Sequence, residues 1–309
     1  MLTVLFSTKN RAARLPEVLE CFTRLQSPSG QWKLVIVDNG STDDTLEVLA
    51  SFAGRLPLVW FSEPKPGKNS ALNTGLAHIE GDLVVFTDDD VFPHPQWLVE
   101  LRKAADTQSA FSLFGGVILP RWETPPPAWV KWVDKASVYT LTDPKLREGP
   151  MPPYLLFGPN MAIRAGVFDD GIHFDPSIGP SGSEYPMGSE TELTLRLDRS
   201  GYASWHVPAA VVEHFIREEQ LHKPWIWRRA IRFGRGQYRI LGAEERVRFW
   251  KGIPLYLFYR LLKQGIRMIL TRVLFQEGAF FRSRWRFHFL CGQVMEARIM
   301  AREKSTNWE

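Results

Sequence analysis

Short apolar runs alternate with amphipathic stretches along the first part of the chain. The runs at 2–6, 33–38, 58–61 and 82–87 are too short for buried helices and therefore predict strands. Between them, apolar residues recur at helical spacing, as in 12–25. Strands that alternate with helices predict a parallel sheet with right-handed crossovers.

The pattern changes in the second half of the chain. The segment 122–153 is rich in proline and aromatic residues, which predicts a long, partly irregular loop near the functional site. A helix at 190–200 and a strand at 204–212 return to the earlier alternation, whereas the pattern after them is helical. We therefore expect an α/β domain at 1–222 followed by a helical region at 223–309.

The fourth predicted strand ends in three consecutive carboxylates, Asp88, Asp89 and Asp90. Ligands bind at the carboxyl ends of strands in open parallel sheets, and neighbouring carboxylates repel one another unless a cation compensates them. Oxygen ligands suit Mg²⁺ or Mn²⁺, which usually bridge to substrate phosphates. The run therefore predicts a metal–phosphate site, with a simple acidic turn as the alternative.

The composition is that of a globular protein rich in aromatic residues, with 12 Trp and 20 Phe among 309 residues. The two cysteines, Cys21 and Cys291, are too few for a disulfide framework or a cysteine zinc site, which fits a reducing compartment. A strand-like segment follows Met1 at once, so we expect no signal peptide. No uncharged apolar stretch approaches the roughly 20 residues of a spanning helix, and we expect a cytoplasmic protein.

Charge is distributed unevenly along the chain. Between Lys223 and Lys304 there are 19 lysines and arginines against 5 acidic residues, a net charge of +14, which leaves −10 for the rest of a chain whose total is +4. This asymmetry indicates an anionic partner surface, either lipid or nucleic acid.

A basic amphipathic helix is predicted within this C-terminal third. Its polar stripe contains Arg260, Lys263, Gln264 and Arg267. Such a helix can lie on the anionic inner face of the cell membrane; the alternative is that it packs its apolar face on the preceding domain. No nucleic-acid motif accompanies the basic residues, so we expect no nucleic-acid partner. The apolar face consists of Leu255, Phe258, Tyr259, Leu262, Ile266, Ile269, Leu270 and Val273.

Six short motifs follow one another along the first part of the chain. They are FSTKNR at 6–11, VDNGSTDDT at 37–45, GKNSALNTGL at 67–76, GDLVVFTDDD at 81–90, GPNMA at 158–162 and GSETEL at 188–193. Each is weak alone, but six in this order are specific. Over about residues 1–220 the chain resembles the family 2 glycosyltransferases of the GT-A fold.

The resemblance implies a fold and an activity. The fold is a Rossmann-like, mixed but mostly parallel sheet flanked by helices, here with a basic amphipathic helical C-terminal region. The activity is metal-dependent, inverting transfer of a sugar from a nucleotide-diphosphate donor to a hydroxyl of a glycan, glycolipid or other glycoconjugate, with Mn²⁺ or Mg²⁺ as cofactor. A catalytically inactive scaffold or carbohydrate-binding protein is the alternative. A sugar-nucleotide pyrophosphorylase shares the architecture, but the turn at 7–11 lacks the glycines of its signature.

The resemblance also implies residues that bind the donor. Asp38 matches the aspartate that hydrogen-bonds the base, with a plain capping or turn aspartate as the alternative, and the backbone around Thr8 should lie against the same base. The three aspartates match the DxD-type element, in which an earlier acid, Asp88, binds the ribose and a later one binds the metal. Either Asp89 or Asp90 can be that direct ligand.

Glu190 matches the position of the catalytic base, which takes a proton from the acceptor hydroxyl. In the family this acid is commonly the Asp of a Glu-Asp pair at a helix start, whereas this chain has Ser189-Glu190. Glu192 is the fallback. The alternative is that Glu190 only complements the dipole of its helix.

Three further sets of residues have candidate roles. Lys68 and Asn73 lie where a helix opens before the acidic strand and are expected to contact phosphate or ribose, although a solvated surface lysine is an equal alternative. His214 follows the last predicted strand and, by resemblance, can complete the metal shell; a structural histidine is the alternative. An acceptor platform is possible on the loop tryptophans, which could equally be packing anchors: Trp122, Trp129 and Trp132.

Overall fold

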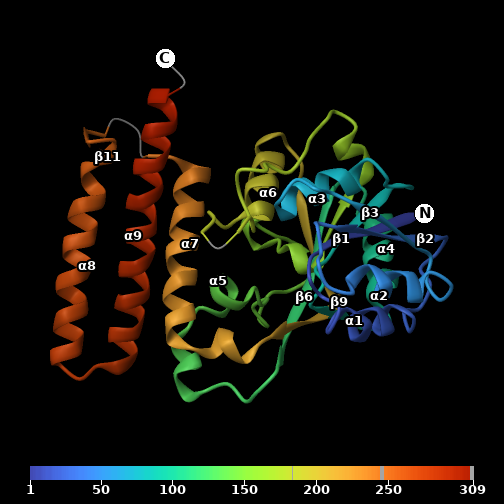
Figure 1. Cartoon of the computed structure of the whole chain (residues 1–309), viewed down its shortest axis with the longest axis horizontal. Coiled ribbons are helices and arrows are strands. Elements are labelled where there is room, and N and C mark those ends of the chain that lie inside the picture. The colour runs from blue at the N-terminus through green and yellow to red at the C-terminus, as the bar shows by residue number, and fades with distance from the viewer. Residues whose placement is uncertain (183, 244–246, 307–309) are drawn as a thin grey trace. The chain divides into compact units, whose positions relative to one another are not determined.

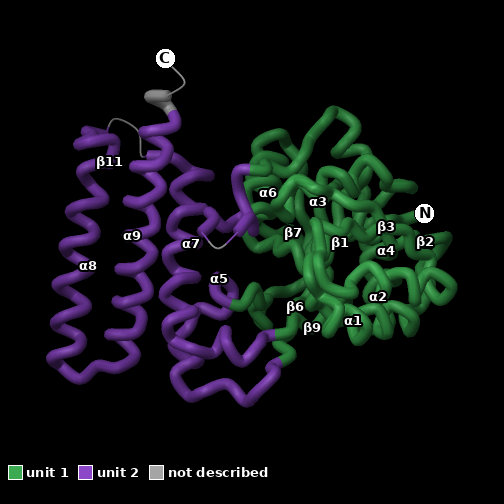
Figure 2. The backbone as a smooth tube through the Cα atoms, viewed as in Figure 1, with its two compact units in different colours: residues 1–121, 139–176, 189–215 green, residues 122–138, 177–188, 216–309 purple. Residues whose placement is uncertain are grey.

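The structure is a computed structural model that describes residues 1–182, 184–243 and 247–306 (Figure 1). It contains two compact units, and each has its own apolar core (Figure 2). The second unit contains the described part of 223–309 together with segments that lie before residue 223 in the chain. The first unit comprises residues 1–121, 139–176 and 189–215, and the second comprises 122–138, 177–188 and 216–309.

One mixed sheet organises the first unit (Figure 1). Among the described residues it has nine strands in the order β3-β2-β1-β4-β8-β6-β9-β5, with β7 paired to β9. Strands β1 to β4 pair in parallel, and β8 turns the remainder of the sheet antiparallel. The predicted α/β class is therefore confirmed. The strands are β1 (Leu2–Thr8), β2 (Trp32–Asp38), β3 (Leu58–Ser62), β4 (Leu83–Phe86), β5 (Val91–Pro93), β6 (Leu113–Trp122), β7 (Gly149–Pro150), β8 (Met161–Arg164) and β9 (Ser204–Ile216).

The register of the parallel strands positions the polar residues that follow them. Thr8 pairs with Asp38 across β1 and β2, so both lie at the carboxyl edge of the sheet. Leu5 pairs with Phe86 across β1 and β4, which brings the residues after Phe86 alongside the end of β1. The acidic run therefore reaches the same edge as Thr8 and Asp38, where parallel sheets bind ligands.

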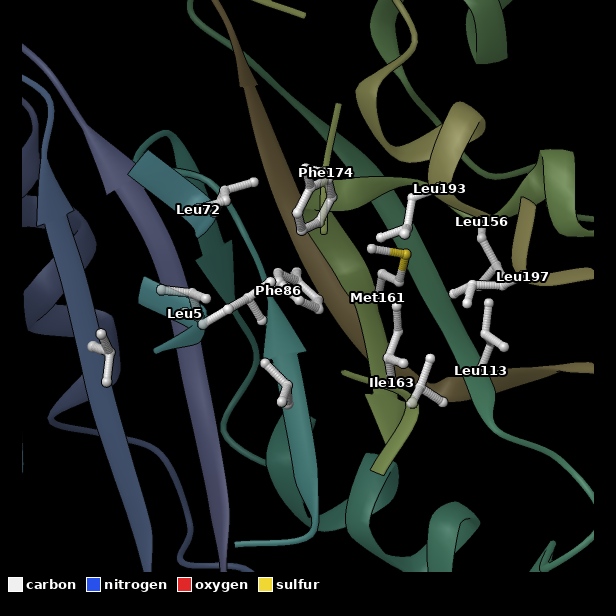
Figure 3. Close-up of a cluster of buried hydrophobic side chains, with 14 of the residues drawn as sticks. Leu5, Leu72, Phe86, Leu113, Leu156, Met161, Ile163, Phe174, Leu193 and Leu197 are labelled. Atoms are coloured by element: carbon white, nitrogen blue, oxygen red, sulfur yellow. The ribbon is translucent and has the colours of Figure 1, made fainter. Parts of the chain in front are cut away.

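A layer of apolar side chains fixes two helices against one face of this sheet (Figure 3). Leu5 and Phe86 from the sheet are buried in one cluster with Leu72 of α3 and Leu193 of α6. Burial of one such side chain contributes about 1.5–3 kcal/mol, so the cluster holds both helices firmly. The helices of this part of the chain are α1 (Leu15–Phe22), α2 (Thr45–Phe52), α3 (Lys68–Leu76), α4 (Trp97–Thr107), α5 (Lys135–Tyr139) and α6 (Ser189–Arg199).

Three long helices and a short hairpin build much of the second unit. Helix α9 packs against both α7 and α8 (Figure 1). At Gly234 of α7 a Cβ atom would lie 1.9 Å from the carbonyl oxygen of Phe289, so only glycine allows this approach of α7 to α9. The elements are α7 (Lys223–Leu241), β10 (Phe249–Trp250), β11 (Ile253–Pro254), α8 (Leu255–Val273) and α9 (Glu277–Thr306).

The structure refines two expectations from the sequence. The segment 122–153 is largely irregular, as predicted, with a 3-10 helix at Ala128–Trp132 and the short α5. The helical pattern after 223 is interrupted by the β10–β11 hairpin, which the sequence analysis missed. Within the described part of the chain, no helix combines the length and the apolarity that crossing a membrane requires.

Candidate active site

The loops that follow β2 and β3 are tied together at the carboxyl edge of the sheet. Asp38 is buried, and its carboxylate accepts the backbone N–H groups of Gly40 and Ser41 at 3.2 Å. The Asn39 side chain donates to the Lys65 carbonyl at 2.8 Å and accepts the Gly67 N–H at 2.8 Å. Asp38 thus ends β2 and shapes the turn that follows it, while Asn39 positions the start of α3. Contact of Asp38 with a base stays a prediction.

The loop after β1 is locked to the same region. The Asn10 backbone has a positive φ of 53°, and its side chain accepts the Thr42 N–H at 2.8 Å. The Arg11 N–H donates to Thr45 Oγ1 at 2.9 Å. These bonds hold the segment around Thr8 close to the turn that contains Asp38.

Asp89 turns inward and joins the ends of β1 and β4. Its carboxylate accepts the Thr8 hydroxyl at 2.9 Å and pairs with Arg11 Nε at 3.0 Å. Burial raises the pKa of Asp89 to about 6, although the Arg11 charge opposes that rise. Because both carboxylate oxygens are bonded to protein groups, Asp89 holds the end of β4 to the end of β1 and the loop that follows it.

Lys68 bridges two carboxylates that are distant in sequence. Its Nζ lies 2.6 Å from Asp88 Oδ1 and 2.7 Å from Glu190 Oε1. Burial opposes the charge of Lys68, but the two carboxylates outweigh it and raise the pKa of the ammonium group. The solvated-surface alternative for Lys68 therefore does not hold.

Glu190 and Glu192 face different surroundings at the start of α6. Glu190 lies with Lys68, whereas Glu192 forms a bidentate pair with Arg196 at 2.8 Å on the next turn. At Gly158 an added Cβ would lie 2.4 Å from Glu190 Oε1, so the absence of a side chain leaves room for this carboxylate. The structure therefore brings Glu190, and not Glu192, to the acidic edge.

Asp90 lies close to His214 on the other side of the acidic run. His214 Nε2 is 3.6 Å from Asp90 Oδ1. His214 Nδ1 lies 2.8 Å from the Tyr139 carbonyl, and a carbonyl partner requires Nδ1 to carry the proton. In the neutral ring with the proton on Nδ1, the Nε2 lone pair faces a cation site, as in many metal-binding histidines.

These residues fit a divalent cation that also uses substrate oxygens. Across the described residues, no group of three or more His, Cys, Asp or Glu side chains is arranged to hold a metal by itself. Asp90 and His214 supply one oxygen and one nitrogen within reach of a common ion. Mg²⁺ sites commonly use one or two carboxylates together with substrate phosphates, and imidazole nitrogen suits transition-metal ions, so Asp90 and His214 fit a cation that a diphosphate also binds.

Asn73 is not brought to this cluster. Its amide makes two bonds to the backbone of Phe174, donating to the carbonyl at 2.9 Å and accepting the N–H at 2.9 Å. The side chain thus fastens α3 to the segment that contains Phe174. A contact with the donor stays a prediction from the sequence.

Two tryptophans of the predicted platform pack inside the second unit. Trp129 and Trp132 have ring centroids 5.4 Å and 6.0 Å from that of Phe281 on α9. This is the packing alternative for both side chains. Trp122 is the last residue of β6.

Arg11, Gly158 and the Lys68–Glu190 pair were not predicted from the sequence. Arg11 and Gly158 lie inside motifs at 6–11 and 158–162, so the motifs could have indicated them. The ion pair joins residues 122 positions apart, and no local pattern predicts such a contact.

The parallel half-sheet, its acidic edge and the base candidate define an α/β protein with a candidate ligand site at the carboxyl edge of its sheet. Residues 3–170 match the model of the family described as "Glycosyl transferase family 2". The chain belongs to this family.

Two relatives and one solved structure illustrate the similarity. The chain is 22% identical over 311 residues to "Probable glycosyltransferase YdaM" of Bacillus subtilis, covering 96% of this chain and 65% of the relative. It is 23% identical to "Glycosyltransferase AglE" of Haloferax volcanii, covering 65% of this chain and 62% of the relative. The chain therefore spans somewhat less than two thirds of the length of these relatives.

The solved structure is a mannosyltransferase, PcManGT from Pyrobaculum calidifontis, in complex with GDP-Man and Mn²⁺. The two chains share 18% identity with a TM-score of 0.65, over 96% of this chain and 86% of that one. At this identity the likeness concerns the fold, which is GT-A in both.

Proposed function

We propose that this protein transfers a sugar from a nucleotide-diphosphate donor to a hydroxyl of a glycan, glycolipid or other glycoconjugate, at a cytoplasmic location. The observation that carries the proposal is the Lys68 bridge, which places the base candidate Glu190 beside Asp88 of the acidic run. Family membership supports the reaction class. The mannosyltransferase of the same fold, which binds GDP-Man and Mn²⁺, supports the donor class.

The donor is proposed to lie along the carboxyl edge of the parallel strands. Its base would meet Asp38 and the backbone near Thr8, and its ribose would meet Asp88. Asp90 and His214 would hold Mn²⁺ or Mg²⁺ together with the diphosphate, while Asp89 braces the site through Thr8 and Arg11. When bound, the cation neutralises charge on the departing diphosphate.

Glu190 is proposed as the base. The acceptor hydroxyl loses its proton to Glu190 while its oxygen attacks the anomeric carbon, and a single displacement of this kind inverts that carbon. Lys68 holds the Glu190 carboxylate near Asp88. It therefore positions the base relative to the donor.

Donor binding can be tested by thermal stabilisation with UDP, GDP and dTDP, each with and without Mn²⁺ or Mg²⁺. A ligand that binds only the folded protein raises its stability according to the ratio of ligand concentration to Kd. We expect one nucleotide to stabilise the protein more strongly when the cation is present. Stabilisation by none of them would contradict the donor site.

Turnover separates an enzyme from an inactive scaffold. With the nucleotide identified, sugar transfer or donor hydrolysis should release that nucleoside diphosphate. A pyrophosphorylase would instead form a sugar nucleotide and release pyrophosphate. Nucleotide binding without release of either product would favour the scaffold.

A further inference from the structure

Helix α8 presents a continuous apolar stripe to solvent. Its members recur at intervals of three or four residues, which places them on one side of a helix. The helix contacts α9 through its opposite side, where Leu257 and Thr271 are buried. Between 44% and 66% of each of the following side chains is exposed, and together they are named the α8 stripe: Leu255, Tyr259, Leu262, Ile266, Ile269, Leu270 and Val273.

Exposed apolar residues extend the stripe at both ends of the helix. The β10–β11 hairpin precedes α8 and exposes Phe249 and Trp250. Trp250 packs edge-on against Phe258 of α8, with ring centroids 5.6 Å apart. Leu274 and Phe275 follow α8 directly and are exposed by 62% and 87%. A contiguous apolar surface of this length on a soluble unit indicates an interaction site.

The charged side chains of α8 itself are all positive. Helix α8 contains four exposed basic side chains and no acidic residue. At 3.6 residues per turn, Arg260, Lys263 and Arg267 lie along one edge of the stripe. Long basic side chains can cover apolar surface with their stems while their charged heads reach phosphate groups.

A basic hollow lies beside the hairpin. It has a volume of about 400 Å³ and is lined by Lys251, Gly252, Arg298, Ala301 and Arg302. Its three basic side chains favour an anionic group at this end of α8.

We propose that the α8 stripe, with the hairpin and residues 274–275, docks on a bilayer surface that contains anionic lipids. The apolar side chains would enter the acyl boundary, and the basic edge would contact headgroup phosphates, as in interfacial amphipathic helices. Trp250 and Tyr259 suit the interface between water and lipid. The proposal does not depend on transferase activity.

Charge complementarity selects this partner over two others. A second copy meeting the same face would bring two basic edges together and incur repulsion. A nucleic acid would neutralise the basic edge but leave the α8 stripe in water. An anionic bilayer satisfies both parts of the surface at once.

Flotation of the full chain with vesicles tests the proposal. The probes are vesicles of phosphatidylcholine alone and of phosphatidylcholine mixed with phosphatidylglycerol. We expect binding to the mixed vesicles, weaker binding to the neutral ones, and a decrease as salt screens the charges.

Two pairs of variants assign the surface. Leu262→Glu/Ile266→Glu should lower partitioning onto mixed vesicles by more than about tenfold, because two apolar anchors are lost. Leu46→Glu, on exposed α2 surface, is the matched control and should change nothing. Lys263→Gln/Arg267→Gln should lower partitioning by roughly 30-fold at low salt, whereas Lys103→Gln/Lys145→Gln should not.

Four results would overturn the proposal. The first is that the wild type does not bind mixed vesicles. The second is that Leu262→Glu/Ile266→Glu binds them as strongly as the wild type does. The third is that sedimentation detects an oligomer of the wild type that is absent in this variant, because a second copy would then cover the α8 stripe. The fourth is a large drop in the Tm of this variant, which would show that the α8 stripe is packed against protein. Nucleotide-induced stabilisation should persist in every variant, so failure here is separable from failure of the proposed activity.

Discussion

The carboxylate of Glu190 occupies space that a glycine leaves open. An alanine at position 158 would place its Cβ within 2.4 Å of Oε1 and 2.7 Å of Cγ. These atoms belong to the flexible end of the glutamate, so the side chain can move aside without disturbing the backbone. The free energy of unfolding should therefore change little, but the base would leave its position next to Lys68.

Gly158→Ala is therefore expected to reduce kcat by about 10- to 100-fold, since an ångström of misplacement can have such an effect. The KM for the donor should change little. Steady-state kinetics and Tm measured together check this, with Gly54→Ala as control because no atom lies within 4 Å of a Cβ there. If kcat is unchanged in Gly158→Ala, Glu190 is not the catalytic base.

Glu190→Gln removes the proton acceptor but keeps the shape of the side chain. We expect kcat to fall by about 10²- to 10⁴-fold, the range for loss of a general base, with thermal stabilisation by the nucleotide retained. Glu192 pairs with Arg196, and we expect kcat of Glu192→Gln to fall by less than threefold. Equal losses in the two variants would argue against the assignment.

At the scale of elements, α3 carries Lys68 at its first turn and Asn73 one and a half turns later. Asn73 bonds both backbone groups of Phe174, and Phe174 packs against Phe86 with ring centroids 5.4 Å apart. The amide therefore fastens the helix to the core that supports the acidic run.

Asn73→Ala leaves two backbone groups of Phe174 without their partners and is expected to destabilise the protein by about 1–3 kcal/mol. Urea unfolding measures this loss, and titration with the nucleotide measures donor affinity. We expect the affinity to change by less than twofold. A stable variant with weakened nucleotide binding would instead support the role predicted from the sequence.

Much of the element order could be predicted from the sequence, for identifiable physical reasons. The strands of the parallel half are continuous apolar runs because both faces are covered, and their lengths exclude buried helices. The β10–β11 hairpin was missed because each strand has only two residues, too few for a periodic signal. In the site, Asp88 and Glu190 were found by motif, whereas Lys68 joins them through a tertiary contact that periodicity does not encode.

At the scale of the whole molecule, the two cores are stabilised differently. The first contains apolar side chains on a sheet, whereas the second encloses a fully buried carboxylate, Glu296, between two arginines. Arg235 Nε lies 2.7 Å from Glu296 Oε2, and Arg239 bonds Oε1. Removing one partner of a buried ionic group leaves uncompensated charge, which is strongly destabilising.

Glu296→Gln is expected to lower the free energy of unfolding of the second unit by about 3–5 kcal/mol. Glu303→Gln, at an exposed position that pairs with Arg239 at 3.0 Å, should cost less than about 0.5 kcal/mol. Calorimetry can resolve whether one transition or two shift, because chains with more than one unit need not unfold in a single step. The candidate donor site lies within the first unit, so stabilisation by nucleotide and Mn²⁺ should survive in Glu296→Gln. A neutral effect of Glu296→Gln would mean that water reaches the arginines and that the second core does not depend on this ion cluster.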